Sequence, residues 1–262
     1  GGEMPLIKAE SVCFSYGDAP ILKDIDLEFD GPGLYCIIGP NGVGKSTLIK
    51  CMNGLLEPTS GRVMVNGRDV SECSVKELSK EISYVPAATS IGFPMSVVDS
   101  ILLARDSRTK WRLDDEDIAL AYRSLRVMNM DELALRGCNE LSAGQMQKAS
   151  ICRGLVRQSD IMILDEPASN LDIRHQIFIS DFLQKLARKS GQLIVMISHD
   201  LNIAARFADS VVVMSHPGVI HSFGPPSDVI NERMISEVYS VKSEVIDHNG
   251  RPHIILESAE SW

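Results

Sequence analysis

The apolar and polar positions follow two different patterns along the chain. Over the first 30 residues they alternate, as in the segment 21–29, which reads Ile-Leu-Lys-Asp-Ile-Asp-Leu-Glu-Phe. A period of two is typical of antiparallel strands that have one face in water. Four later runs are continuously apolar and separated by helical stretches: residues 34–38, 161–164, 193–197 and 211–214. Such runs are typical of parallel strands that are covered on both faces.

Residues from about 95 to 158 show helical periodicity without a convincing strand, and from about residue 226 the pattern predicts a helix and a hairpin around 247–250. The predicted fold class is therefore α/β, with a mostly parallel sheet in the core, an N-terminal antiparallel β subdomain and an inserted α-helical subdomain. We assign 4–87 and 159–225 to the core with its β subdomain, 88–158 to the helical subdomain and 226–262 to a C-terminal extension.

Composition narrows the class of partners. The chain has 262 residues, 44 % of them apolar, which suits one large α/β domain or a core with a smaller inserted lobe. A net charge of −9 argues against a broad nucleic-acid surface, so no nucleic-acid partner is expected. No run approaches the 18 apolar residues of a membrane span, and the six cysteines lack metal-ligand spacing. These features predict a cytoplasmic protein.

The segment 39–47 fits the phosphate-loop pattern GxxxxGK(S/T). It follows a predicted strand and opens a predicted helix, where backbone N–H groups and the positive helix end can surround a polyphosphate. Lys45 is expected to reach the β and γ phosphates, Ser46 to bind Mg²⁺ and Thr47 to contact the α phosphate. The alternative is a chance match in a Gly-rich turn, which this setting disfavours. The predicted nucleotide-binding residues are Gly39, Pro40, Asn41, Gly42, Val43, Gly44, Lys45, Ser46 and Thr47.

Two carboxylates follow the apolar run 161–164, at the carboxyl edge of a predicted buried strand. Open α/β sheets bind ligands at this edge. Asp165 is placed to hold Mg²⁺, directly or through water, and Glu166 to act as general base for attack on the γ phosphate. Acidic residues also end strands and cap helices for structural reasons. Together with Lys45 and Ser46, the pattern favours the chemical role.

Three further segments carry candidate binding residues. In Leu141-Ser-Ala-Gly-Gln145, which precedes a predicted helix, a hydroxyl, an open backbone and a positive helix end suit an anion, although the segment alone could be an N-cap. His199 follows an apolar strand and alone could be a strand-edge histidine. Tyr16 alone could be a packing residue.

In their order along the chain, these motifs resemble those of the ATPase subunits of ABC transporters, over about residues 5 to 255. The resemblance implies that Tyr16 stacks on adenine and that His199 contacts the γ phosphate, so that the catalytic residues are Glu166, His199 and Lys45. It makes the segment 169–172 the loop that crosses a dimer interface, with Asp172 as the interface residue. It also makes 141–145 the signature, with nucleotide-binding residues Ser142, Ala143, Gly144 and Gln145, although glycine is usual where Ala143 stands.

The resemblance implies a mechanism and a set of partners. Two ATP molecules, each with Mg²⁺, would lie between two copies in a head-to-tail dimer, each bound by the phosphate loop of one copy and the signature of the other. Hydrolysis would reopen the dimer. Transport would require two integral membrane permease subunits, docked at about residues 85–105, and indirectly a substrate-binding protein. The chain would then lie on the inner face of the cell membrane.

One position departs from the family pattern. After the predicted strand that includes residues 82–86, the family normally has a glutamine that touches Mg²⁺ and the attacking water, whereas this chain has Ala87-Ala88-Thr89. We expect weaker organisation of Mg²⁺ or altered coupling to the membrane subunits, with ATP binding retained. Water or Thr89 could fill the gap.

Within the family, the segments 93–105, 171–176 and 237–241 resemble importers of iron chelates, haem or cobalamin. The main alternative is a soluble ABC ATPase. A DNA-repair type is disfavoured because only 93 residues, 48 to 140, separate phosphate loop and signature, and a translation type because only one ATPase module is present. An iron–sulfur assembly role and a regulatory module that binds ATP without rapid hydrolysis stay open, although Glu166 and His199 count against the latter.

Overall fold

The structure, a computed structural model, describes residues 6–87, 94–105, 113–169 and 171–259. Its centre is a six-stranded sheet with the strand order β10-β9-β3-β8-β7-β6. All neighbours are parallel except β9 and β10, which are antiparallel. The strands are β3 (Gly33–Ile38), β6 (Ile82–Val85), β7 (Ile161–Leu164), β8 (Leu193–Ile197), β9 (Ser210–Ser215) and β10 (Val219–Gly224). All four apolar runs are strands of this sheet, so the prediction of a mostly parallel sheet is confirmed.

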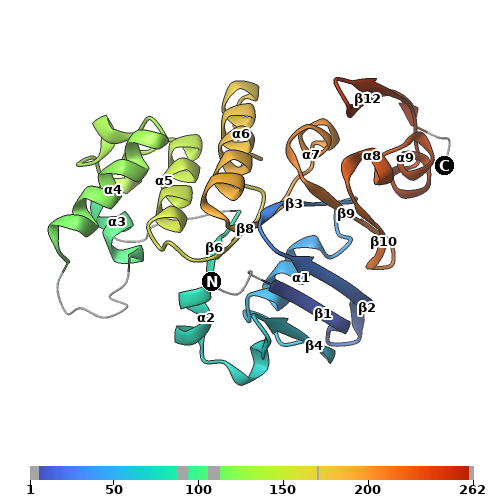
Figure 1. Cartoon of the computed structure of the whole chain (residues 1–262), viewed down its shortest axis with the longest axis horizontal. Helices are drawn as coiled ribbons and strands as arrows, with labels where there is room; N and C mark the ends of the chain where they lie inside the picture. Colours follow the sequence, from blue (N-terminus) through green and yellow to red (C-terminus); the bar gives the residue numbers. More distant parts are fainter. Residues whose placement is uncertain (1–5, 88–93, 106–112, 170, 260–262) are drawn as a thin grey trace.

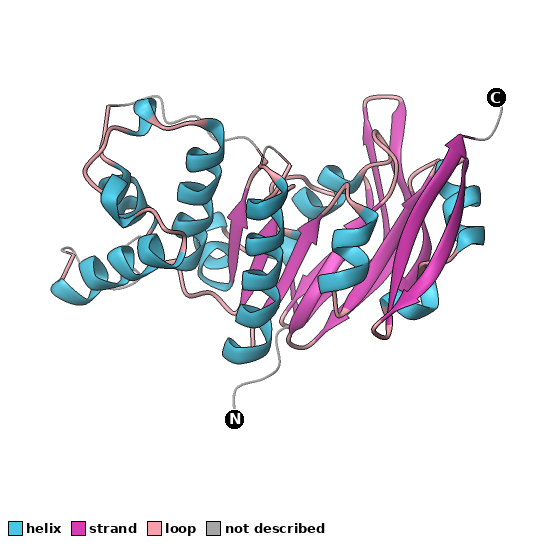
Figure 2. Ribbon diagram, turned by 90° about the horizontal axis from the view of Figure 1, so that it is seen from above, coloured by secondary structure: helices cyan, strands magenta, loops and turns pink. Residues whose placement is uncertain are grey.

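Both faces of the central sheet are buried. Alternate residues of β3 enter two different clusters, Cys36 with the helices α5 (Ala143–Leu155), α6 (Ile173–Ser190) and α7 (Leu201–Phe207), and Ile37 with α1 (Lys45–Met52) and α2 (Val75–Glu81). Figure 1 shows α6 on one side of the sheet and α1 on the other, while Figure 2 gives the view from above. Burial on both faces explains why the runs 34–38, 161–164, 193–197 and 211–214 are continuously apolar.

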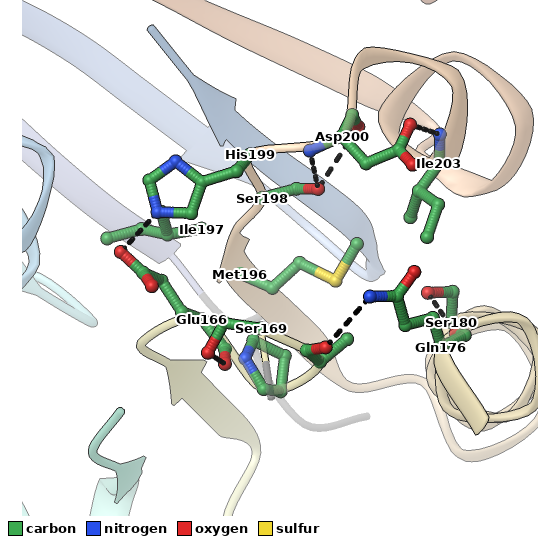
Figure 3. A pocket seen from close by; sticks show the side chains of 12 residues that line it. Glu166, Ser169, Gln176, Ser180, Met196, Ile197, Ser198, His199, Asp200 and Ile203 are labelled. Atoms are coloured by element: carbon green, nitrogen blue, oxygen red, sulfur yellow. Dashed lines mark hydrogen bonds and ion pairs between the residues drawn. The ribbon is translucent and has the colours of Figure 1, made fainter. Parts of the chain in front are cut away.

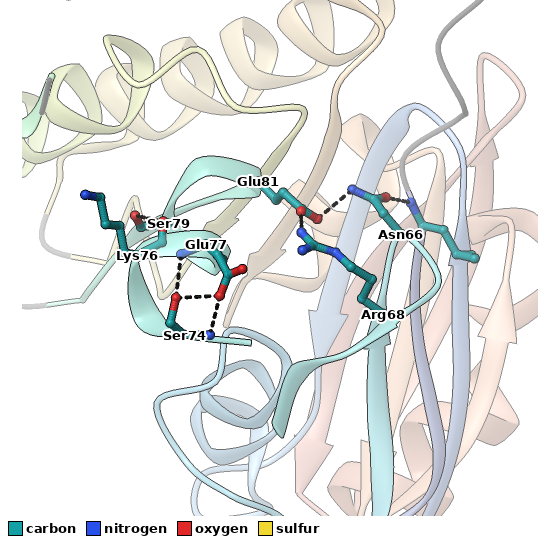
Figure 4. A network of polar contacts seen from close by, with 8 residues as sticks. Asn66, Arg68, Ser74, Lys76, Glu77, Ser79 and Glu81 are labelled. Carbon is teal, nitrogen blue, oxygen red and sulfur yellow. Dashed lines mark hydrogen bonds and ion pairs between the residues drawn. The ribbon is translucent and has the colours of Figure 1, made fainter. Parts of the chain in front are cut away.

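The N-terminal residues form a second, antiparallel sheet with the order β2-β1-β4-β5, as the alternating pattern predicts. Its strands are β1 (Leu6–Tyr16), β2 (Ala19–Asp30), β4 (Ser60–Val65) and β5 (Arg68–Asp69). Glu81, the last residue of α2, joins this sheet to the core: it pairs with Arg68 and accepts a hydrogen bond from Asn66 (3.0 Å; Figure 4). Ser74 and Glu77 cap α2 reciprocally at its start.

Between β6 and β7 the described residues contain helices and no strand, in line with the predicted helical subdomain. These helices are α3 (Val97–Ala104), α4 (Asp115–Val127) and α5, and they lie together at one end of the molecule (Figure 1). The exact limits of this subdomain, 88 and 158, stay a prediction. Residues 88–93, which include Thr89, and Asn170 lie outside the described residues. No described helix has the length and apolar character of a membrane span.

The C-terminal extension begins with two helices, α8 (Pro226–Val229) and α9 (Glu232–Tyr239), and ends in a hairpin of β11 (Val241–His248) and β12 (Arg251–Ala259). Its turn contains Asn249 and Gly250, both with positive φ (57° and 76°), which is the conformation that two-residue hairpins prefer. The predicted helix and hairpin are therefore present. The extension lies at the opposite end from α3 and α4 (Figure 1).

Candidate functional site

The loop between β3 and α1 has a shape that only glycine allows at two positions. A Cβ on Gly39 would lie 2.4 Å from the carbonyl oxygen of Met214. Gly44, which precedes α1, has φ of 103°, and its Cβ would lie 2.8 Å from Leu22. The close fit to β9 and β2 holds the loop at the end of the sheet, with the N-terminal end of α1 pointing into it.

Lys45 is buried beside this loop. Its Nζ donates hydrogen bonds to the carbonyl oxygens of Gly39 (2.7 Å) and Pro40 (2.8 Å). Burial lowers the pKa of this ammonium group, while the nearby carboxylates of Glu166 and Asp165 oppose that effect. A buried ammonium group next to a loop of this shape is suited to a phosphate group.

Asp165 lies at the end of β7 and accepts a hydrogen bond from the Ser46 hydroxyl on α1 (Oγ to Oδ1, 3.0 Å). Burial raises the pKa of this carboxyl group, against the hydrogen bond from Ser46. Tyr84 on β6 also hydrogen-bonds the carboxylate, and burial together with Asp165 raises the pKa of that phenol to about 12. Asp165 is thus fixed by side chains from two flanking elements.

Two oxygen ligands, the Asp165 carboxylate and the Ser46 hydroxyl, therefore lie side by side. This donor set fits Mg²⁺, which typically takes one or two protein oxygens and fills its remaining positions with phosphate and water oxygens. It does not fit a soft transition metal, and the described residues contain no cluster of three or more histidine, cysteine or acidic side chains suited to one.

Glu166 and His199 face each other from the ends of neighbouring parallel strands, β7 and β8. The distance from His199 Nε2 to Glu166 Oε1 is 2.5 Å (Figure 3). Glu166 has φ of 50°, in the left-handed region that non-glycine residues rarely adopt. Such a backbone conformation persists where the surrounding structure imposes it, which occurs frequently at functional sites.

Glu166 and His199 line one cavity of about 220 Å³ at the end of the sheet, together with residues of the loop before α1 and of α1 itself. The predicted residues brought together there are Asn41, Gly42, Gly44, Lys45, Ser46, Thr47, Glu166 and His199. Ile21 of β2 lines the same cavity and was not predicted. Tyr16 lies at the end of β1, 53 % exposed, with its ring edge-on to Phe14 at 4.8 Å between centroids, and is not part of the cavity lining. Such an exposed ring is free to stack on a base.

The signature residues lie elsewhere, at the start of α5. The Ser142 hydroxyl accepts from the backbone N–H of Gln145, and the Gln145 side chain accepts from the N–H of Ser142, so both close the capping box of this helix. None of Ser142, Ala143, Gly144 and Gln145 lines the cavity around Lys45. Ser142 and Ala143 are exposed, and the N-terminal end of a 13-residue helix suits an anion that another molecule presents.

Asp172 caps the helix that follows β7. Its carboxylate accepts from the backbone N–H of His175 (2.9 Å) at the start of α6, and its side chain is exposed. Leu171 packs against Gly144 closely enough that a Cβ on that glycine would lie 3.0 Å from its Cδ2. The loop before α6 therefore touches the start of α5 within one chain.

Two residues of the site, Ile21 and Tyr84, escaped sequence-based prediction. Ile21 reads as one apolar position of an alternating strand, and Tyr84 as one residue of a short strand. The parallel register of β6 with β7 pairs Tyr84 with Ile163, two residues before Asp165, which puts the phenol on the face of Asp165. A register prediction for these two strands would have found it.

The chain is similar to one family model and to curated proteins over most of its length. The sequence model of the ABC transporter family matches residues 22–169. The hemin import ATP-binding protein HmuV of Rhodopseudomonas palustris is 34 % identical, over 97 % of this chain and 96 % of its own length. A Bacillus subtilis protein named "Probable siderophore transport system ATP-binding protein YusV" is also 34 % identical, over 92 % and 88 %.

Among solved structures, the ATP-binding cassette MJ0796, in a dimeric post-hydrolysis state bound to ADP and Pi, has the same fold. The TM-score is 0.76 at 25 % identity, over 84 % of this chain and 98 % of that one.

Proposed function

The chain belongs to the ABC transporter family and is a nucleotide-binding ATPase, and from this premise we propose that it drives an importer of metal chelates. The cargo class is an iron–siderophore, haem or cobalamin type of chelate. In this proposal the chain hydrolyses ATP at a head-to-tail dimer interface and powers two separate permease subunits. Its place is on the cytoplasmic face of the cell membrane.

One observation carries the dimeric part of the proposal. The cavity around Lys45 contains the phosphate loop, Glu166 and His199, whereas Ser142 to Gln145 start a different helix outside it. The exposed N-terminal end of α5 does not line that cavity. In the proposal, each phosphate loop holds ATP and the signature of the second copy covers the γ phosphate, while Asp172 lies at the interface. The dimeric cassette of the same fold supports this arrangement.

The chemistry assigned to the site is attack of water on the γ phosphorus. The Glu166 carboxylate accepts the proton of that water, His199 holds Glu166 and the γ phosphate in line, and the bond to the β-phosphate oxygen breaks to give ADP and Pi. Lys45 neutralises phosphate charge. Mg²⁺, held by Ser46 and Asp165, would add charge stabilisation for the β and γ oxygens. Tyr16 would stack on adenine.

The cargo class rests on the relatives, whose names refer to siderophore transport and hemin import at 34 % identity. Because they match this chain over 92 % and 97 % of its length, the proposal extends to their kind of transport. The permeases would dock at about residues 85–105, of which 88–93 lie outside the described residues, and a substrate-binding protein would take part indirectly.

Uptake measurements test this role. A strain that lacks the gene should lose uptake of one labelled cargo among an iron–siderophore, haem and cobalamin. The wild-type gene should restore it, and a Glu166→Gln gene should not. Unchanged uptake of all three, with a loss of iron–sulfur enzymes instead, would point to the soluble assembly class.

A further inference from the structure

The C-terminal ends of three helices meet at one arginine. Arg157 is the second residue after α5, the helix that starts with the signature residues. Its guanidinium group donates to the carbonyl oxygen of Ala104, the last residue of α3 (3.2 Å). It also donates to the carbonyl oxygen of Ser79, in the last turn of α2 (2.5 Å). The chemistry assigned above gives Arg157 no role.

The chemistry of helix ends explains these contacts of Arg157. The last four carbonyl oxygens of a helix have no partner within that helix, and they carry the negative end of its dipole. The oxygens of Ala104 and Ser79 are of this kind. A guanidinium group presents five N–H donors in one plane, so a single arginine can bind carbonyl oxygens of two helices while it follows a third. Arg157 is half-buried at this junction.

A second arginine joins the same helix ends in the opposite direction. Arg105, directly after α3, donates to the carbonyl oxygen of Val156, directly after α5 (2.9 Å), and pairs with Asp117 of α4 (2.7 Å). The contacts of Arg105 described here thus connect α3, α4 and α5 with one another. Arg157 also reaches α2, which leads directly into β6 of the central sheet. It therefore links the helices of the predicted helical subdomain to the core.

The end of α5 is also attached to β6. A Cβ on Gly154 would lie 2.8 Å from Val85, and the Ser83 hydroxyl donates to the carbonyl oxygen of Gly154 (3.1 Å). From this attached end, α5 extends back over 13 residues, about 20 Å, to the signature. A rotation of about 5° around the attached end would move the signature by about 2 Å, enough to lose a hydrogen bond to a phosphate.

We propose that Arg157 is a positioning residue that fixes the direction of α5, so that the signature of one copy meets the ATP held by the other. The inference rests on the proposed head-to-tail dimer. Its physical basis is pre-organisation, because a helix that already points correctly loses less freedom when two copies associate. Arg157 does not line the cavity around Lys45. It therefore acts on association of the copies and leaves the nucleotide affinity of the single chain unchanged.

The first test measures association and nucleotide binding separately in the full-length Glu166→Gln chain. Arg157→Met removes all the donors and keeps a long side chain. Sedimentation with saturating ATP and Mg²⁺ should show a dimer dissociation constant about 3- to 10-fold higher, from the loss of these hydrogen bonds. Calorimetry should show ADP affinity within about twofold and an unchanged stoichiometry. Arg126→Met, at an exposed position of α4, is the matched control.

The second test uses turnover in chains that keep Glu166. At chain concentrations below the dimer dissociation constant, Arg157→Met should hydrolyse ATP about 3- to 10-fold more slowly per chain. The rate should approach that of the wild type as the chain concentration rises. Ser83→Ala removes the other polar attachment of α5 and should change the dimer constant in the same direction. Partial unfolding would instead lower turnover equally at every concentration, together with the stoichiometry of ADP binding.

Three results would overturn the inference while the dimer and the ATPase function stand. They are a dimer constant of Arg157→Met equal to that of the parent chain, an equal rise in Arg126→Met, and a loss of turnover that does not depend on chain concentration. If the parent Glu166→Gln chain binds ATP but does not dimerise, the proposed dimer fails, and the inference fails with it.

Discussion

The Nε2 atom of His199 lies 2.5 Å from Oε1 of Glu166, and each residue is the second one after the end of a buried parallel strand. Only the neighbouring order of β7 and β8 in the sheet brings these residues together, because they lie far apart in the sequence. The pair leaves one carboxylate oxygen of Glu166 for a water molecule. It is therefore the part of the site whose loss should affect turnover most selectively.

His199→Ala should lower kcat for ATP hydrolysis by about 10²- to 10⁴-fold, the range that positioned acid–base groups contribute. KM should change little, since Lys45 and the loop remain. Steady-state phosphate release measures both constants. His221→Ala is the matched control, because it breaks another His–Glu pair, with Glu237, outside the cavity. Equal losses in both variants would contradict the assignment.

Lys45→Ala should weaken ATP binding by about 10- to 100-fold, since it removes a charge-assisted contact to phosphate. The fold should survive, because the change also removes a buried charge that now binds only loop carbonyls. Calorimetric titration with ATP measures the effect. Lys185→Ala, on the exposed face of α6, serves as control. Retained affinity in Lys45→Ala would show that the loop does not hold the phosphates.

Asp165→Asn should raise the thermal midpoint of unfolding near pH 7, without Mg²⁺ or nucleotide. The folded pKa of Asp165 lies above its ordinary value, mainly because of burial, so the folded state binds more protons and loses stability as pH rises through about 4. Asparagine carries no charge and removes this loss. Each kcal/mol of unfolding free energy that is recovered raises the thermal midpoint by about 2–4 °C. Melting curves from pH 3.5 to 8 should show that the difference in midpoint between Asp165→Asn and the wild type becomes smaller as the pH falls. A lower midpoint at every pH would contradict this account.

Ala87→Gln should change the Mg²⁺ dependence of hydrolysis, because it restores a carboxamide that the family usually has after β6. Ala87 lies two residues beyond Val85, whose carbonyl oxygen accepts from the N–H of Asp165 (2.8 Å). We expect a lower Mg²⁺ concentration at half-maximal rate and unchanged ADP affinity. The prediction fails if rate and Mg²⁺ dependence both equal those of the wild type.

Much of the fold and site follows from local sequence. The runs 34–38, 161–164, 193–197 and 211–214 predict buried strands because both faces are covered, and the carboxyl ends of such strands carry Asp165, Glu166 and His199. The edge strand β10 was not predicted, since its side chains are largely half-exposed or exposed and give it no continuous apolar run.

The rest depends on contacts between distant segments. Tyr84 reaches Asp165 only through the register of two strands, and Ile21 lines the cavity only because β2 passes the loop. Tyr239, near the other end of the chain, packs against the core cluster that contains Cys36 and Ile38 of β3. No local pattern encodes such pairings, because each residue alone is consistent with ordinary core packing.

The central claim, that a second copy completes the ATP site, is tested most directly by the mass of the Glu166→Gln chain in solution. With saturating ATP and Mg²⁺, light scattering should give twice the chain mass of 28.8 kDa, because ATP persists between the two copies. With ADP it should give 28.8 kDa. Adding Gly144→Glu, which puts a carboxylate at the start of α5, should keep the single-chain mass even with ATP bound. A Glu166→Gln chain that binds ATP to saturation and stays at the single-chain mass would contradict the account.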